Sequence, residues 1–247
     1  MWLGALLVFS ACPKTVPPRQ LEQIGSVDEA LRDAEAAWAQ RPDVTAVRKA
    51  LSLFQSAAAA DPSRVEGDLN VVRVVGWLLE HGAKEDRKAL ADEAVVAGER
   101  CQRRQPDSAS CNYWQAVAMG LRIREHKLTA ITGLSKVIDQ LKKAAGQDAA
   151  LDEGGPSRVL ALLLVRAPSW PAGPGNADDA LQAAQQAVAH GPDHPLNQLV
   201  LGECLEATGE TEGAKAAYRR AAELGRARKD PDGADFARQA EAALAKL

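Results

Sequence analysis

"ALSLFQSAAAADP", residues 50–62, carries a small residue, an aromatic residue, a second small residue and a proline at offsets 0, 4, 7 and 12. Three other segments start with alanine and keep most of this order: "AVVAGERCQRRQP" (94–106), "ALQAAQQAVAHGP" (180–192) and "AKAAYRRAAELGR" (214–226). Small residues three or four positions apart share one helix face and let a second helix approach closely. Proline lacks the amide hydrogen that a helix interior needs, so it ends the helix. Each segment is therefore predicted to be one helix of an antiparallel hairpin.

These offsets resemble those of the second helix in a tetratricopeptide (TPR) unit. Residues 195–228 have the length of one such unit, and the register places Gly202 of its first helix opposite Ala214. The earlier units are longer and contain additional helices or loops. We predict an all-α domain over residues 27–247, a TPR-like α-solenoid of stacked antiparallel helical hairpins. Residues 231–247 form an amphipathic segment whose polar face suits a C-terminal capping helix.

Composition and motifs argue against several classes of function. The formal net charge of −3 indicates no general affinity for nucleic acid. The sequence has no glycine-rich phosphate loop, no GxSxG and no HExxH motif. His190 and His194 are four residues apart, but Gly191, Pro192 and Pro195 interrupt the helix that would align them as metal ligands. We therefore expect no enzyme, no metal and no cofactor.

The first residues, "MWLGALLVFSAC" (1–12), form an apolar run that ends in small residues and a cysteine. Spanning a bilayer takes about 20 apolar residues, so the run is too short for that. Its last four residues resemble the bacterial lipoprotein box, although no basic residue precedes the run. The resemblance implies a signal peptide at 1–11, diacylation of Cys12 and a flexible tether at 12–26. The protein would then be periplasmic, anchored to the cell membrane or the outer membrane; the alternative is a buried or disordered N-terminal segment.

An exported protein meets an oxidising compartment, where disulfides persist. Cys101 and Cys111 bracket "QRRQPDSAS", a predicted connection between two helices. Two interpretations stay open: a disulfide across the turn, or two small buried thiols. Cys204 falls in the middle of a predicted helix and is expected in the core.

A loop rich in proline and glycine, "RAPSWPAGPGNADDA" (166–180), stands where an ordinary TPR has a tight turn between two helices. The first helices of a solenoid line a concave groove, which is the natural place for a peptide or small ligand. Groove positions in the TPR register are Leu69, Arg73, Trp77, Tyr113, Val117, Leu121, Leu199, Glu203 and Glu206. Arg158 and Trp170 are added as candidates for a pore or cleft beside the loop. The alternative is that several of these side chains only pack against neighbouring helices.

Three stretches resemble the T component of TPR-associated TRAP transporters, the TatT family of lipoproteins. They are "YWQAVAMG" (113–120), "GGPSRVLALLLVRAP" (154–168) and "WPAGPGNADDALQAAQQAVAHGPDHP" (170–195). The resemblance implies a periplasmic partner of the TRAP substrate-binding protein, with a hydrophobic or organic-acid ligand. It also implies a homotrimer with a channel through each protomer. On this interpretation the loop keeps its two helices apart and shapes the pore, and Trp170 pins it down.

Two alternatives to the transporter accessory remain. The first is a scaffold lipoprotein whose groove binds proteins during assembly of envelope complexes. The second is a carrier of a hydrophobic ligand, which would need an apolar tunnel between the helix at 157–167 and the loop at 168–176.

Overall fold

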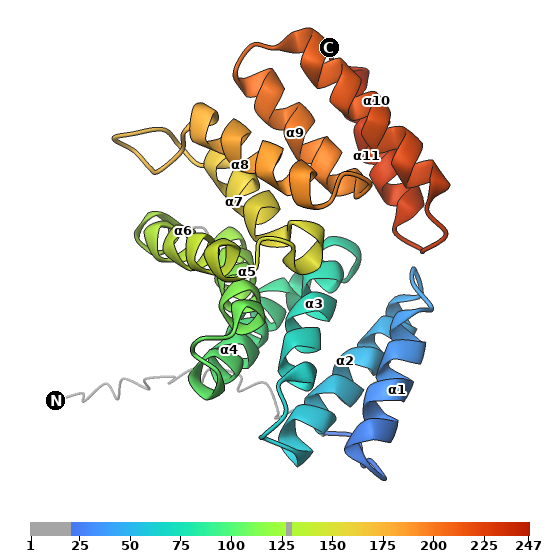
Figure 1. Cartoon of the computed structure of the whole chain (residues 1–247). Helices are drawn as coiled ribbons and strands as arrows, with labels where there is room; N and C mark the ends of the chain where they lie inside the picture. Colours follow the sequence, from blue (N-terminus) through green and yellow to red (C-terminus); the bar gives the residue numbers. More distant parts are fainter. Residues whose placement is uncertain (1–20, 127–129) are drawn as a thin grey trace, which may run out of the picture.

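The computed structural model describes residues 21–126 and 130–247, and helices account for most of them (Figure 1). The α-helices are α1 (Val27–Trp38), α2 (Val44–Ala60), α3 (Glu66–His81), α4 (Arg87–Arg104), α5 (Ala109–Glu125), α6 (Ala130–Gln147), α7 (Gly155–Arg166), α8 (Ala177–His190), α9 (Pro195–Ala207), α10 (Thr211–Ala227) and α11 (Gly233–Leu244). Within these two ranges no β-strand forms beyond an isolated bridge between Ser169 and Gly175. The prediction of an all-α fold is confirmed.

Consecutive helices pair as antiparallel hairpins: α1 with α2, α3 with α4, α5 with α6, α7 with α8, and α9 with α10. The second helix of each hairpin packs on the first helix of the next, and α11 covers α9 and α10 as the predicted cap. The small residues that start the four repeat segments explain this close packing. Ala50, Ala94, Ala180 and Ala214 are all fully buried.

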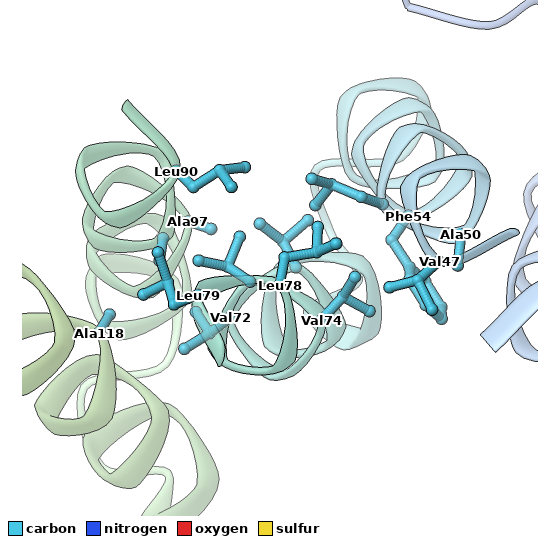
Figure 2. Close-up of a cluster of buried hydrophobic side chains, with 14 of the residues drawn as sticks. Val47, Ala50, Phe54, Val72, Val74, Leu78, Leu79, Leu90, Ala97 and Ala118 are labelled. Atoms are coloured by element: carbon cyan, nitrogen blue, oxygen red, sulfur yellow. The ribbon is translucent and has the colours of Figure 1, made fainter. Parts of the chain in front are cut away.

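Helix α3 shows how the stack is held together (Figure 2). Val74 points from α3 toward Val47 on α2, whereas Leu79 points toward Ala97 on α4. Phe54, the aromatic residue of the first repeat segment, is fully buried in the same cluster. Burial of a phenylalanine side chain contributes about 1.5–3 kcal/mol to folding, so this position is a main source of stability for the first two hairpins.

Two glycines explain close approaches between helices. Gly154 precedes α7 with a φ of 85°, and a Cβ there would lie 2.6 Å from the backbone oxygen of Ala187 on α8. At Gly202 the nearest side-chain atoms belong to the ring of Tyr218, where a Cβ would approach to 2.4 Å. The expected partner of Gly202, Ala214, lies one helical turn away from that contact. The larger tyrosine ring takes the space that glycine leaves.

The loop between α7 and α8 is tied down by its own backbone. The amide of Gly175 donates to the Pro168 oxygen at 2.8 Å, and the amide of Asn176 donates to the Leu164 oxygen at 3.1 Å. Asn176 then caps α8, since its side chain accepts from two backbone amides of the first turn. The loop projects from the stack in Figure 1, while α7 and α8 pack on each other like the other hairpins. The expectation that the loop holds the two helices apart is wrong.

Candidate functional site

Three of the predicted groove residues lie inside the protein. Tyr113, Arg158 and Leu199 have exposed fractions of 2%, 4% and 4%. The prediction that they line an open groove or pore is therefore wrong. Tyr113 packs in the core cluster that α5 shares with α6, α7 and α8, and Leu199 packs in the cluster of α9, α10 and α11.

Tyr113 and Arg158 belong instead to a buried polar network. The Tyr113 hydroxyl donates to Asp152 Oδ2 at 2.7 Å, and Arg158 Nη2 donates to the same oxygen at 2.6 Å. Arg158 Nη1 also donates to Asn197 Oδ1 at 2.8 Å. Burial, with the nearby Asp152 carboxylate, raises the pKa of Tyr113 far above its usual range. The network joins α5, α7 and α9, and its role is to hold three hairpins together.

The amide nitrogen of Asn197 completes this network. Nδ2 lies 2.8 Å from the Glu153 oxygen, 2.9 Å from the Ala187 oxygen and 2.7 Å from the Gly191 oxygen. The sequence patterns did not identify Asp152 or Asn197 as members of a site. The sequence around a single asparagine at the start of a helix does not show whether its side chain is exposed or buried with several hydrogen bonds to other helices.

Two other predicted residues, Arg73 and Trp77, lie in an aromatic cluster on α1, the turn after it and α3. We call it the tryptophan cluster (Trp38, Arg41, Arg73, Trp77 and His81). The Trp38 and Trp77 rings meet edge to face at 6.4 Å, and His81 stacks on Trp77 at 4.1 Å. The guanidinium groups of Arg41 and Arg73 lie 3.7 and 5.0 Å from the centre of the Trp38 ring. Cation–π contacts of this kind stabilise the cluster.

The tryptophan cluster meets the C-terminal cap. Arg41 Nε and Nη2 donate to the two carboxylate oxygens of Asp232 at 3.1 and 3.0 Å. His81 Nε2 lies 2.8 Å from Asp235 Oδ2. In Figure 1 the loop after α1 accordingly points toward the loop between α10 and α11. Two of the predicted groove residues, Arg73 and Trp77, thus lie next to a contact between the first and last parts of the described chain.

Of the other predicted groove residues, Glu206 is exposed and the rest are only partly exposed. Val117 packs against the two larger core clusters, Leu121 packs against the first, and Leu69 is half-buried. The charged candidates have partners of their own. Glu203 receives two hydrogen bonds from Arg166, at 3.0 and 2.7 Å, and Glu206 accepts one from the Tyr218 hydroxyl at 2.9 Å.

Trp170 has an exposed fraction of 86%. It neither lines a cavity nor pins the loop, so both predictions for this side chain are wrong. The backbone hydrogen bonds at Gly175 and Asn176 hold the loop without help from the indole.

Two open grooves lie between second helices of consecutive hairpins. One, of about 540 Å³, is bounded by α6 and α8 with Leu160 and Leu164 of α7 at its floor. The other, of about 250 Å³, is bounded by α2 and α4 with Val71 of α3 at its floor. A carrier of a hydrophobic ligand was expected to have a tunnel between the helix at 157–167 and the loop at 168–176. Neither groove is lined by residues of that loop.

Cys101 and Cys111 are bonded to each other in the structure, with their Cα atoms 5.3 Å apart. Cys204 is a buried free thiol, and burial raises its pKa to about 12. Cys12 lies outside the described residues. Over residues 21–126 and 130–247, no three His, Cys, Asp or Glu side chains gather where a metal could bind. In the same ranges no helix combines the length and apolar character needed to cross a membrane.

Comparison of the sequence with known protein families and with curated proteins finds no match. Solved structures show the fold. The chain is similar to TTC0263, a thermophilic TPR protein of Thermus thermophilus, with 21% identity and a TM-score of 0.65 over 89% of this chain and 100% of that one. It is also similar to yeast Tom70, with 17% identity and a TM-score of 0.54 over 90% of this chain and 40% of Tom70. At these identities the likeness establishes a TPR-like fold and no more.

Proposed function

We propose that this protein is a scaffold that binds another protein through the outer surface of its helical stack. A TPR-like solenoid supports such a role because its stacked hairpins present a long, regular surface. The grooves between second helices and the loop at 168–176 are accessible parts of that surface.

The observation that carries the proposal is the position of Trp170. A tryptophan side chain prefers burial, and tryptophan is among the residues that contribute most to the affinity of protein interfaces. Here it is 86% exposed on a loop that backbone hydrogen bonds hold in place. A rigid loop loses little conformational entropy on binding, which favours a contact centred on this side chain.

A narrower form of the proposal is an accessory lipoprotein of a TRAP-type transporter. Support comes from the Gly-Gly-Pro start of α7 and from the proline-rich loop, the features that resemble the TatT family. In this form the partner is the periplasmic substrate-binding protein, Cys12 carries the lipid anchor, and protomers associate as trimers. Membrane release of a Cys12→Ala variant, measured by fractionation, tests the anchor; retention on the membrane contradicts it.

The test of the scaffold proposal is site-specific photo-crosslinking of the full chain in its own host. A photoreactive amino acid replaces Trp170 in one variant and the exposed Arg219 of α10 in the control. We expect a protein captured from position 170 and not from 219. The identified protein should then bind the purified chain, with affinity at least about ten-fold weaker for Trp170→Ala, the loss expected for an interface anchor.

The identity of that protein separates the two forms of the proposal. A TRAP substrate-binding protein supports the accessory role, whereas a component of another envelope complex supports the general scaffold. Equal capture from both positions, or unchanged affinity of Trp170→Ala, contradicts the proposal. Far-UV circular dichroism of Trp170→Ala should match the parent, because the side chain makes few contacts with the rest of the fold.

A further inference from the structure

We propose that the groove between α2 and α4 binds the chain's own residues 16–20, "VPPRQ", as an extended segment that leads into Leu21. Those residues lie outside the described chain, which begins at Leu21. The composition of the groove and the way the chain enters it point to them as the occupant. The docking does not depend on the partner proposed above.

The groove exposes apolar side chains. Among the described residues only four large apolar side chains are exposed, and two of them, Leu21 and Val96, lie in this groove. Each has an exposed fraction of 51%. Ala58 and Ala59 of α2 and Val71 of α3 make the rest of the lining small and apolar. Exposed apolar surface of this kind favours an apolar occupant.

Gln55 of α2 shows what kind of apolar occupant fits. Its side chain lines the groove with an exposed fraction of 9%, and within the described chain neither its amide oxygen nor its amide nitrogen has a hydrogen-bond partner. A buried polar group without a partner is costly. The backbone of an extended segment offers the carbonyl and the N–H that match this amide, whereas an acyl chain offers neither. The groove therefore favours a peptide segment.

The charged rim of the groove requires no acidic partner. Arg100 Nε and Arg104 Nη1 donate to the two carboxylate oxygens of Asp68 at 3.0 and 2.8 Å, and Asp68 is fully buried. Because both guanidinium groups already share this carboxylate, neither needs one from the occupant. A run without acidic residues, such as residues 16–20, is compatible with this rim.

The entry of the chain into the groove favours its own preceding residues over a segment of another protein. Ile24 packs against the first core cluster, and Leu21, three residues earlier, lines the groove. A polyproline II segment has three residues per turn, so Pro18 would follow on the same face. Pro17 and Pro18 favour that conformation, because the ring fixes φ near −65°. Residues joined directly to Leu21 are also present at high effective concentration.

Docking of residues 16–20 would also orient the protein on a membrane. This consequence, unlike the docking itself, rests on the lipid anchor of the narrower proposed function. The residues between Cys12 and Leu21 span at most about 30 Å when fully extended. Docking shortens this tether and turns the face formed by α2 and α4 toward the membrane.

The experiment measures the distance between the segment and α4 in the full chain with Cys12→Ala. Nitroxide labels are attached to cysteines introduced at Lys14, next to the segment, and at Glu99, an exposed residue of α4. The labels are directed there because Cys101 and Cys111 are bonded and Cys204 is buried. We expect double electron–electron resonance to show one narrow distance component, whereas an undocked segment gives a broad distribution.

Two variants and a matched control make the result decisive. Val96→Gln removes apolar contact from the groove, so the ratio of narrow to broad component should fall at least about three-fold. The control, Leu247→Gln, changes another exposed apolar residue and should keep the parent ratio. The double substitution Pro17→Gly and Pro18→Gly lies outside the helical stack, and it should lower the ratio about four-fold or more, because the segment loses its preformed conformation.

The proposal is overturned by a broad distribution in the parent, or by a Val96→Gln variant that keeps the parent ratio. Mixing labelled chains with an excess of unlabelled chains tests a second copy as the source of the segment. A narrow component that persists supports docking within one chain, whereas its disappearance assigns the groove to a neighbouring copy and overturns the proposal. Far-UV circular dichroism of Val96→Gln should match the parent, since the side chain is half exposed.

Discussion

The guanidinium of Arg158 on α7 donates to the side-chain oxygen of Asn197 on α9 at 2.8 Å, and both side chains are almost completely buried. The same guanidinium reaches Asp152, which also receives the Tyr113 hydroxyl. A buried charge is costly unless its hydrogen bonds are complete, so each member of this network depends on the others. The network connects three hairpins where an ordinary repeat relies on apolar contacts.

Asn197→Ala should destabilise the protein by about 2–3 kcal/mol, because it leaves Arg158 and three backbone oxygens without their shared partner. Urea unfolding monitored by circular dichroism measures the loss. The matched control is Gln198→Ala on the same helix, whose amide donates only to the Pro192 oxygen at an exposed position. The control should change the free energy of unfolding by less than about 0.5 kcal/mol. Similar losses in the two variants would contradict the structural role of the network.

Gly154→Ala and Gly209→Ala form a second matched pair, since both glycines have a positive φ, of 85° and 84°. A Cβ at Gly209 meets no atom within 4 Å, so the substitution should cost only the backbone strain of about 1 kcal/mol. At Gly154 the Cβ would also lie 2.6 Å from the Ala187 oxygen, which forces α7 away from α8. We expect a loss of about 2–4 kcal/mol there, measured by thermal and urea unfolding. Equal losses would show that α7 and α8 are not held as closely as described.

The Cys101–Cys111 bond can be tested by counting thiols in a Cys12→Ala variant, where Cys101, Cys111 and Cys204 remain. Alkylation in denaturant without reductant should modify Cys204 alone, and prior reduction should expose all three. Reduction should also lower the free energy of unfolding by about 2–3 kcal/mol, as expected for a short closed loop. Three reactive thiols without reductant would favour the alternative of two buried free cysteines.

The lowered pKa of His194 predicts that the folded protein loses stability in acid. Burial, with the nearby Arg158 and Arg228, lowers its pKa to about 3, and its Nδ1 accepts a hydrogen bond from the Leu196 amide. The pKa of His194 is lower in the folded state than in the unfolded state. The stability that neutral His194 contributes is therefore complete above about pH 6.5 and is lost as pH falls toward 3. We expect about 1–2 kcal/mol less stability at pH 5 than at pH 7 from this residue. His194→Asn keeps a capping acceptor without a titrating ring, so its unfolding free energy should fall less over that interval. An identical fall in both proteins would remove His194 as the cause.

How far the sequence predicts the fold depends on periodicity. The repeat segments starting at Ala50, Ala94, Ala180 and Ala214 were sufficient to predict the hairpins, because burial of small residues on one helix face is a local property. The same reasoning predicted the cap, whose apolar positions share one side of α11.

The candidate site was predicted less well. Trp77 and Arg73 are partly exposed on α3, but Tyr113 and Arg158 are buried in a network that no spacing rule identifies. A TPR register says which way a side chain leaves its helix. It does not say whether the next hairpin covers that side.

The sequence by itself determined the helices, their pairing into hairpins and the position of the proline-rich loop, since helix faces, proline and glycine act over a few residues. Only the tertiary structure decided that Trp170 faces solvent, that Asn197 clamps two hairpins, and that Arg41 and His81 meet Asp232 and Asp235. Those contacts join residues up to 191 positions apart, and their geometry depends on the summed tilt of every hairpin between them.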